Sequence, residues 1–476
     1  MPHTLSESNL DFLKGARWYG HKGLALKGIR VIDTADVFQD HQLCLFEFEF
    51  KDTSREVYLI LTRDNASRFV RIGQPVFLNL FMQTLGKGGS LKMQNGEIRC
   101  ASLGGWAFNT AAAAYHNLPA LTTNSLIRIE HNQTDRLIIK FARRLQKGSN
   151  VEVEVNRHLA IHGKTASVPP LRAYAVYTNH QGDQYHIAAL FDFIKSHGNG
   201  WAWTLKCLEA FIKETLQTNC DVLKTSGAFY HERMRQLGEQ LAALHVCLSQ
   251  KGEGNFGVKK ITRDDINAWK QGWLTQLEKS FALIRASTVA NKDLGTVRDN
   301  EQQIRTIFES SGDTFLKLGY KIRQHGDFHF EQVLVCDDGF CIMDFEGEPL
   351  KPYAERAIHY PALKDVAGLL RSLNYAGFSA YFKACQTVID PVIRDKIKQL
   401  CARWESWSQT AFLNGYYGRL KEQQAPFLPL SDMPTIDMAL KIMILDKALY
   451  EIEYEINNRP DWLPIPLSGI LGVLEK

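Results

Sequence analysis

Two carboxylates and an amide, Asp327, Asp344 and Gln332, are the side chains whose types and spacing most suggest chemistry. Between them, the residues Asp337-Asp338-Gly339 separate two short apolar runs, which is typical of a β-hairpin. The two strands of the hairpin are predicted over residues 332–336 and 340–345. Because antiparallel strands place their outer ends side by side, we expect the three side chains to share one small volume.

Oxygen ligands in this arrangement suit the transfer of a phosphoryl group. The reaction needs one acid that orients the attacking hydroxyl and accepts its proton, and further oxygen atoms that hold Mg²⁺ against the phosphates. Protein kinases supply these groups in the pattern H-R-D-x-x-x-x-N followed by D-F-G. Here His325-Gly326-Asp327 is followed five residues later by Gln332, and Asp344-Phe345-Glu346 follows the hairpin. The alternative, acids gathered by chance on a surface loop, is disfavoured because all three groups keep the kinase spacing.

The composition places this site in an ordinary globular protein. The chain has 476 residues, 45% hydrophobic and 23% charged, which indicates more than one structural unit. A formal net charge of +4 is small for this length, so we expect no nucleic-acid and no membrane partner. The N-terminal segment lacks the apolar core of a signal peptide, and the nine cysteines include no Cys-x-x-Cys pair. We therefore expect a reduced, cytoplasmic enzyme.

A lysine upstream fits the same chemistry. Two strands are predicted over residues 125–130 and 136–141, and Lys140 lies at the end of the second one. In a kinase, the lysine at this place reaches the phosphates of the nucleotide. The alternative is an edge lysine whose aliphatic stem lies along the sheet. The downstream motif favours the kinase interpretation.

The partners of Lys140 are predicted on both sides of it. A helix is expected to begin near Asn150, and Glu154 on this helix is placed to pair with Lys140, with Glu152 as the rival two residues away. The turn before Lys140 contains no G-x-G-x-x-G. Backbone N–H groups and small hydroxyl side chains, among them Ser125, are therefore expected to bind the phosphates.

The rest of the chain suggests two lobes and a cap. Two strands over 171–177 and 185–193 lead into a linker, where backbone groups at Asp192 and Phe193 are placed to bind adenine. From Trp201 onward, apolar residues recur at three- and four-residue spacing, which predicts amphipathic helices. The predicted division is an N-terminal cap (1–105), a small lobe with the linker (106–200) and a mostly helical large lobe (201–476).

Several motifs in this order resemble those of bacterial maltokinases. They are HGDFHFEQVL (325–334), DFEGEP (344–349), LKDVAGLLRSL (363–373), RWYGHKG (17–23), WAWT (201–204) and ALYEIEYEINNRPDWLPIPL (448–467). The resemblance implies an α+β, two-lobed, protein-kinase-like fold of the aminoglycoside phosphotransferase type, with an N-terminal mixed α/β cap and a mostly helical C-lobe. It also implies transfer of the ATP γ-phosphate to the anomeric hydroxyl of maltose, which gives maltose 1-phosphate for α-glucan synthesis, with trehalose synthase as a candidate partner.

Carried over position by position, the resemblance implies roles for four residues: Asp327 as catalytic base, Gln332 and Asp344 as Mg²⁺ ligands, and Lys140 as the phosphate-binding lysine. The chain departs from the expected HGDLHLGQ by Phe-Glu in place of Leu-Gly, and Glu331 adds a negative charge beside the metal ligand. The sugar is expected to contact residues of the large lobe. The candidates are His325, Glu346, Arg371, Tyr416, Tyr450, Glu451 and Tyr454.

Two alternatives stay open at this stage. One is another small-molecule kinase of the same fold, for glucosamine or an aminoglycoside, because Glu346, Glu348 and Glu451 offer the extra carboxylate that a cationic sugar requires. The other is a non-catalytic kinase-like module that binds a partner through its cap. The second is disfavoured because the set of Lys140, Asp327, Gln332 and Asp344 is intact.

The substitution Asp327→Asn tests the central assignment. A general base typically contributes about 10²–10⁴-fold to the rate, so the variant should keep its fold and its nucleotide binding but lose most of its turnover. Asp338→Asn, in the predicted hairpin turn, is the matched control and should leave turnover unchanged. Wild-type turnover in Asp327→Asn would remove this residue from the role of base.

Overall fold

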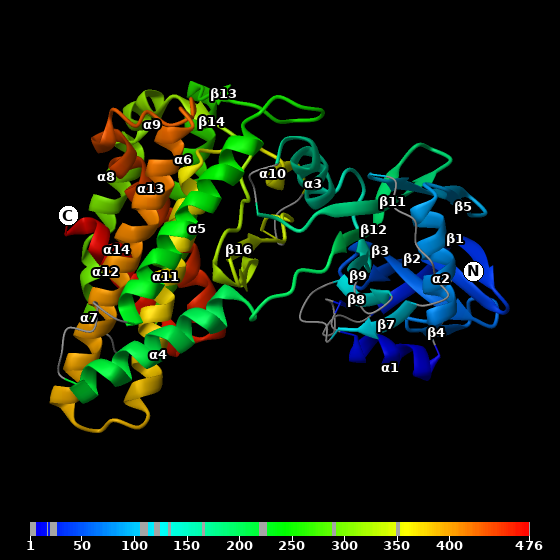
Figure 1. Ribbon diagram of the computed structural model, residues 1–476, viewed down its shortest axis with the longest axis horizontal. Helices are drawn as coiled ribbons and strands as arrows, with labels where there is room; N and C mark the ends of the chain where they lie inside the picture. The colour runs from blue at the N-terminus through cyan, green and yellow to red at the C-terminus, as the bar shows by residue number, and fades with distance from the viewer. Residues whose placement is uncertain are drawn as a thin grey trace. The chain divides into compact units, whose positions relative to one another are not determined.

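The computed structural model describes residues 6–16, 18–19, 26–104, 113–118, 124–131, 135–163, 167–218, 226–287, 292–348 and 353–475. The chain forms two compact units (Figure 1). The first comprises Met1–Ala160 and Pro169–Ile194, and the second comprises Ile161–Val168 and Lys195–Lys476. Among the helices of the described ranges, none combines the length and the apolar character that a bilayer crossing requires.

The first unit is built mainly from antiparallel strands. Its elements are α1 (Glu7–Gly15), β1 (Leu26–Phe38), β2 (His41–Phe50), β3 (Arg55–Arg63), β4 (Arg68–Val70), α2 (Pro75–Gly86), β5 (Ser90–Lys92), β6 (Gly96–Ser102), β7 (Ala113–Asn117), β8 (Asn124–His131), β9 (Asp135–Ala142), β10 (Arg144–Leu145), α3 (Val151–His162), β11 (Leu171–Asn179) and β12 (Gln184–Asp192).

Two sheets share the core of this unit. The order of the first is β1-β2-β3-β10, with β4 also paired to β3, and the order of the second is β5-β6-β11-β12-β9-β8-β7. Buried side chains of both sheets and of α2 form one hydrophobic cluster. β5 and β6 lie in the stretch predicted as cap, yet β6 pairs with β11 of the predicted small lobe. The three-part division therefore stays a prediction beside the two units that the structure shows.

The second unit is mostly helical. Its elements are α4 (Gly200–Thr218), α5 (Ser226–Leu248), β13 (Lys259–Lys260), α6 (Arg263–Ala286), α7 (Lys292–Asp299), α8 (Glu301–Ser310), α9 (Gly312–Leu318), β14 (Tyr320–Lys321), η3 (Phe330–Gln332), β15 (Val333–Cys336), β16 (Gly339–Ile342), α10 (Tyr353–Arg356), α11 (Leu363–Cys385), α12 (Pro391–Glu422), α13 (Met433–Asn458), η4 (Pro460–Trp462) and α14 (Pro464–Leu474).

Most predicted elements are present, with different ends. α1 ends at Gly15, and residues 20–23 lie outside the described part. α8 and α9 are separate helices, because the chain turns between Ser310 and Gly312. α6 begins with a capping box in which Thr262 and Asp265 exchange hydrogen bonds, and this feature fixes its first turn.

The hairpin of the second unit is β15–β16, with Cys336 paired to Gly339 across the predicted turn. Its second strand ends at Ile342, three residues earlier than expected. Asp344 therefore lies beyond the strand, in the left-handed region with φ of 67°. Such a backbone is costly for a residue other than glycine and persists where its surroundings hold it.

α5 and α12 cross at very short range in the second unit. A Cβ atom at Gly238 of α5 would lie 2.0 Å from the carbonyl oxygen of Phe412, and a Cβ atom at Gly415 of α12 would lie 2.0 Å from that of Arg235. Both glycines are therefore required by the approach of the two backbones. Tyr416, which follows Gly415, is held against α5 by the same crossing.

Gly415→Ala should lower the free energy of unfolding by about 1–3 kcal/mol or more, because an overpacked core must shift its backbone. Gly418→Ala, three residues on in α12, is the matched control, since a Cβ atom there meets no atom within 4 Å. Alanine is favoured over glycine inside a helix by about 0.5–1 kcal/mol, so the control should be stabilised. Urea unfolding of both variants measures the difference, and equal effects would contradict the close crossing.

Candidate functional site

Asp327 lies between two potential cations. Lys447 Nζ is 3.5 Å from its Oδ1 atom, and His329 Nε2 is 3.8 Å from its Oδ2 atom. Burial alone would raise the pKa of Asp327, but the proximity of His329 and the charges of Lys447 and His325 outweigh it and hold this pKa well below its usual range. Asp327 is therefore ionised at neutral pH.

Lys447 comes from α13 and was not among the predicted site residues. Burial favours its neutral form, yet Asp327, Glu348 and Glu451 outweigh burial and raise the pKa of Lys447. It is therefore an ammonium group at neutral pH. The sequence holds a signal for this position, because Lys447 lies outside the apolar stripe of its helix. The stripe consists of Ile442, Leu445, Leu449, Ile452 and Ile456.

His325 connects the loop that carries Asp327, called the catalytic loop below, to the segment that carries Asp344. The Nε2 atom of His325 is 2.9 Å from the carbonyl oxygen of Met343, while its Nδ1 atom accepts a long hydrogen bond of 3.4 Å from the N–H of Asp327. The N–H of Met343 in turn donates to the carbonyl oxygen of Gln332. His325 is buried and held on both sides, which suits a positioning role, and the prediction that it contacts the sugar stays a prediction.

Asp365 of α11 anchors the same loop and was missed as a site residue. Its Oδ2 atom accepts the N–H of His325 at 2.7 Å, and its Oδ1 atom accepts the N–H of Gly326 at 2.9 Å. A third hydrogen bond, 2.9 Å long, comes from Nε2 of His245, whose Nδ1 atom lies 2.8 Å from the hydroxyl of Tyr416. Burial raises the pKa of Asp365, but His245 and the other donors outweigh it and lower this pKa.

The residues predicted to bind Mg²⁺ supply oxygen atoms that suit that ion. A carboxylate oxygen of Asp344 lies within 4.8 Å of one of Glu346. Gln332 ends η3, and the hydrogen bond from Met343 ties its backbone to the residue before Asp344. Hard divalent cations prefer carboxylate and amide oxygens. Glu346 was predicted to contact the sugar. Its place beside Asp344 also suits a Mg²⁺ ligand.

Three side chains that were predicted to contact the sugar bond to other residues of the second unit: Arg371, Glu451 and Tyr416. Arg371 donates to Glu451 Oε2 through Nε at 2.9 Å and through Nη2 at 2.7 Å, and both side chains are buried. Tyr416 is fully buried, and its hydroxyl bonds to His245. These three side chains pack against and position other groups, and the prediction that they contact a sugar stays a prediction. The stripe pattern in the sequence cannot show that Arg371 and Glu451, eighty positions apart, pair with each other.

Tyr450 and Tyr454 of α13 remain accessible. They are 37% and 47% exposed, in contrast to the other aromatic candidate, Tyr416. Lys447 Nζ lies 5.3 Å from the ring centre of Tyr450, so this ring is next to the ammonium group that faces Asp327. The prediction that these two tyrosines contact a sugar keeps its structural basis.

The lysine of the first unit has a defined partner. Lys140 lies in β9 between β8 and β12, and its Nζ atom is 2.9 Å from Oε2 of Glu152 on α3. The geometry thus supports Glu152, the rival, in place of Glu154 as the ion-pair partner. The N–H of Val153 donates to Oδ1 of Asn150, which confirms the predicted start of this helix.

The other residues of the first unit that were predicted to bind the nucleotide each contact an arginine. Nε and Nη2 of Arg172 donate to the two carboxylate oxygens of Asp192 at 2.7 and 2.6 Å. The N–H of Asp192 donates to the carbonyl oxygen of Pro170, so it is not available to adenine. The guanidinium of Arg128 lies 5.8 Å from the ring centre of Phe193, and Arg143 makes a long hydrogen bond of 3.4 Å to Ser125 Oγ.

Comparison with known proteins supports this interpretation of the fold. No family model matches the sequence. A glucosamine kinase of Streptacidiphilus jiangxiensis is 22% identical over 345 residues, which cover 71% of this chain and 69% of the relative. A glucosamine kinase of Mycolicibacterium smegmatis is 23% identical over 347 residues, which cover 72% and 76%.

The solved structures agree with the sequence relatives. A glucosamine kinase (crystal form B) matches with a TM-score of 0.69 at 19% identity, over 99% of this chain and 100% of that chain. A glucosamine kinase in complex with glucosamine, ADP and inorganic phosphate matches with a TM-score of 0.66 over the same shares. The predicted α+β kinase-like fold is confirmed, since the chain shares the fold of these glucosamine kinase structures.

Asp365→Asn should lower the free energy of unfolding at pH 7 by about 1–3 kcal/mol, because the amide group leaves a buried N–H of the loop without an acceptor. The folded pKa of Asp365 lies below its usual value of about 3.9. Its charged form therefore stabilises the fold fully above about pH 5, and this contribution is lost as the pH falls below about 4.

Urea unfolding of wild type and Asp365→Asn across the pH range checks both parts. The gap between the two proteins should be constant at neutral pH and should narrow in acid. Asp338→Asn in the exposed hairpin turn is the control and should show no gap. A gap that widens in acid would contradict the lowered pKa of Asp365.

Proposed function

We propose that this chain is an ATP-dependent kinase that phosphorylates a hydroxyl group of an amino sugar, with glucosamine as the first candidate. The observation that carries the proposal is the ionised Asp327 beside Lys447, on a loop held at the kinase spacing to Gln332 and Asp344. The relatives named glucosamine kinases, which cover about seven tenths of the chain, support the acceptor.

Asp327 orients the attacking hydroxyl and receives its proton. A carboxylate with a lowered pKa is a weak base, but phosphoryl transfer passes through a loose transition state that needs little proton removal before the bond forms. Positioning then supplies most of the effect. Lys447 keeps Asp327 in its charged form and lies nearest to Oδ1, and the acceptor hydroxyl is proposed to donate to Oδ2, which lies 3.8 Å from His329 Nε2.

The remaining roles are divided between the two units. In the second unit, Gln332, Asp344 and Glu346 would hold Mg²⁺, which when bound neutralises the negative charge of the phosphates. In the first unit, Lys140 is proposed to bind the phosphates of ATP, with Glu152 fixing its ammonium group. These roles follow the protein-kinase pattern, to which the motifs around Asp327 and Asp344 correspond.

The names of the two relatives favour an amino sugar over maltose as the acceptor. Glu451 is occupied by Arg371, whereas Tyr450 remains half-exposed beside Lys447. Glu348 pairs with Lys364 at 2.9 Å, and a carboxylate oxygen of Glu346 lies within 4.8 Å of one of Asp344, where it would serve the metal. Maltose, with trehalose synthase as partner, stays a second candidate that rests on the motif resemblance, whereas the two relatives are named glucosamine kinases.

A panel of acceptors with ATP, followed by phosphorus NMR, tests the proposal. Glucosamine should be phosphorylated with a higher kcat/KM than glucose, N-acetylglucosamine or maltose. Loss of a hydrogen bond to a charged group costs about 1.5–3 kcal/mol, so N-acetylglucosamine, which lacks the ammonium group, should be poorer by about 10–100-fold. The coupling pattern of the product separates phosphorylation at the anomeric position from phosphorylation at the primary hydroxyl.

Two outcomes of this panel decide between the candidates. Preferred phosphorylation of maltose at its anomeric hydroxyl would overturn the amino-sugar proposal and leave the kinase assignment intact. Absence of phosphorylation for every sugar, in protein that binds ATP, would overturn the sugar-kinase assignment as well.

A further inference from the structure

His329 lies two residues after Asp327 in the catalytic loop and was not among the predicted site residues. Its Nε2 atom is 3.8 Å from Oδ2 of Asp327, which is too long for a direct hydrogen bond. The other oxygen, Oδ1, lies 3.5 Å from Nζ of Lys447. None of the hydrogen bonds between described residues uses Oδ2. This oxygen and the imidazole therefore face a common space.

The backbone on both sides of His329 is held against α11. The N–H of Phe330 donates to Oγ of Ser372 at 3.2 Å, and a Cβ atom at Gly368 would lie 2.4 Å from the carbonyl oxygen of Phe328. Both phenylalanines are buried. His329 has an extended backbone, with φ of −154° and ψ of 173°, and successive side chains of an extended chain point to opposite sides. Its imidazole therefore points away from the core that holds the two phenylalanines.

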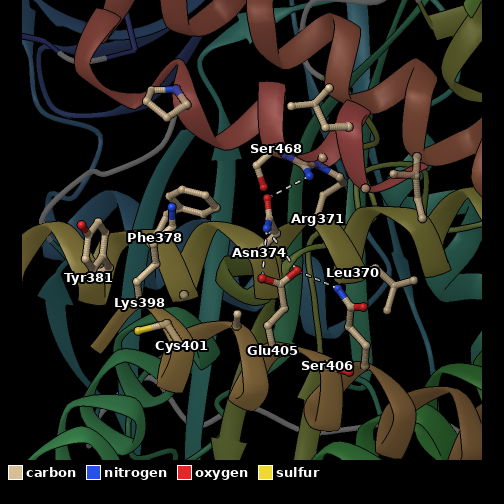
Figure 2. Close-up of a pocket in the computed structure, with 18 of the residues that line it drawn as sticks. Leu370, Arg371, Asn374, Phe378, Tyr381, Lys398, Cys401, Glu405, Ser406 and Ser468 are labelled. Atoms are coloured by element: carbon tan, nitrogen blue, oxygen red, sulfur yellow. Dashed lines mark hydrogen bonds between the residues drawn. The ribbon is translucent and has the colours of Figure 1, made fainter. Parts of the chain in front are cut away.

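Another face of α11 lines a cavity of about 620 Å³ (Figure 2). Figure 2 shows its polar side chains bonded to one another: Arg371 Nη1 donates to Asn374 Oδ1 at 2.9 Å, and Asn374 Nδ2 donates to both oxygens of Glu405 at 3.1 and 3.0 Å. Neither Asp327 nor His329 lines this cavity. Because the proposed base is not in its lining, the cavity is not the place where the acceptor hydroxyl reacts.

The imidazole of His329 is oriented by the short helix η3 that follows it. Its Nδ1 atom accepts the N–H of Glu331 at 3.3 Å, as the N-cap of η3. An imidazole nitrogen that accepts a hydrogen bond carries no proton. The proton of the neutral ring is therefore on Nε2, the atom that lies 3.8 Å from Oδ2 of Asp327. The two side chains thus present one donor and one acceptor to the same space.

One oxygen atom fits between this donor and this acceptor. An oxygen about 2.8–2.9 Å from each of them has the usual hydrogen-bond lengths, and the base of the triangle is the separation of 3.8 Å. A hydroxyl group has one proton and two lone pairs. When its proton points to Oδ2 and one lone pair accepts the Nε2–H, the second lone pair is left for the phosphorus atom.

We propose that His329 is a second catalytic residue, whose Nε2–H donates to the oxygen of the acceptor hydroxyl and turns the hydroxyl proton toward Oδ2 of Asp327. The inference rests on the proposed kinase function and adds a residue to the same site. A carboxylate alone leaves the hydroxyl free to rotate about a single hydrogen bond. A second contact fixes the direction of the attacking lone pair, which is the kind of positioning that phosphoryl transfer requires.

The transfer step is balanced with these two residues. A bond forms between the acceptor oxygen and the γ-phosphorus of ATP, and the bond from that phosphorus to the bridging oxygen of ADP breaks. The hydroxyl proton moves to Oδ2 of Asp327. His329 keeps its Nε2 proton throughout, so it orients the hydroxyl without acting as an acid or a base.

Two amide substitutions separate the roles of the two ring nitrogens. His329→Asn places an amide oxygen near the position of Nδ1 and keeps the cap of η3, because asparagine is favoured at N-caps, but it does not reach the position of Nε2. His329→Gln is one methylene longer, so its amide nitrogen reaches the position of Nε2 while the cap is lost. His231→Asn, exposed on α5, is the control and should turn over as wild type does.

The readouts are kcat with ATP and the best acceptor of the panel, KM for ATP, and the melting temperature. His329→Asn should lose about 10²-fold in kcat, since a misplaced reacting group costs about that much, with the KM for ATP and the melting temperature of wild type. His329→Gln should have a higher kcat than His329→Asn, although it lacks the cap. A kcat of His329→Asn equal to or above that of His329→Gln would show that only the cap matters and would overturn the proposal.

¹⁵N NMR of protein with labelled histidine provides a readout besides activity. The signals of His329, identified by their loss in His329→Asn, should show the proton on Nε2 in the neutral ring, and a proton on Nδ1 would overturn the proposal. The outcomes also separate this inference from the proposed function. A wild type that phosphorylates no acceptor overturns both, whereas an active wild type with the reversed order of the two variants overturns the role of His329 alone.

Discussion

The buried carboxylate of Asp365 is the constraint on which the catalytic loop depends. It accepts the N–H groups of His325 and Gly326, and a third bond from His245. A buried carboxylate is costly unless its lone pairs are filled, and here three donors fill them. Because the two backbone donors directly precede Asp327, one side chain fixes the direction in which the chain presents this proposed catalytic residue.

The support for Asp365 extends to the crossing of α5 and α12. His245 lies on α5 and Tyr416 on α12, and their hydrogen bond requires the two helices to be close together. Gly238 and Gly415 permit that distance, since each faces a carbonyl oxygen of the other helix. Backbone sterics far from the loop thus decide whether His245 reaches Asp365. This chain of contacts explains why Tyr416 is buried, although its type suggested a sugar contact.

The sequence predicted what is local and missed what depends on distant pairing. The hairpin, the start of α3 at Asn150 and the motif around Asp327 follow from turn chemistry, capping and short spacing. The partners Lys447 and Asp365 lie 120 and 40 positions from the groups they contact, and no periodicity encodes such pairing. For the same reason the choice between Glu152 and Glu154 was open, because both lie on the first turn of one helix and only the observed geometry distinguishes them.

A series of alternating charges in the second unit keeps the carboxylate of Asp327 ionised. Asp327 faces Lys447, Lys447 lies one turn from Glu451, and Glu451 pairs with Arg371. The charge of Lys447 lowers the pKa of Asp327, while Asp327 and Glu451 offset the burial of Lys447, and Glu451 offsets that of Arg371. The series thereby maintains Asp327 in its charged form although it is partly buried. A group held charged and oriented before substrate arrives needs no reorganisation during the reaction, which is the main contribution that a protein makes to phosphoryl transfer.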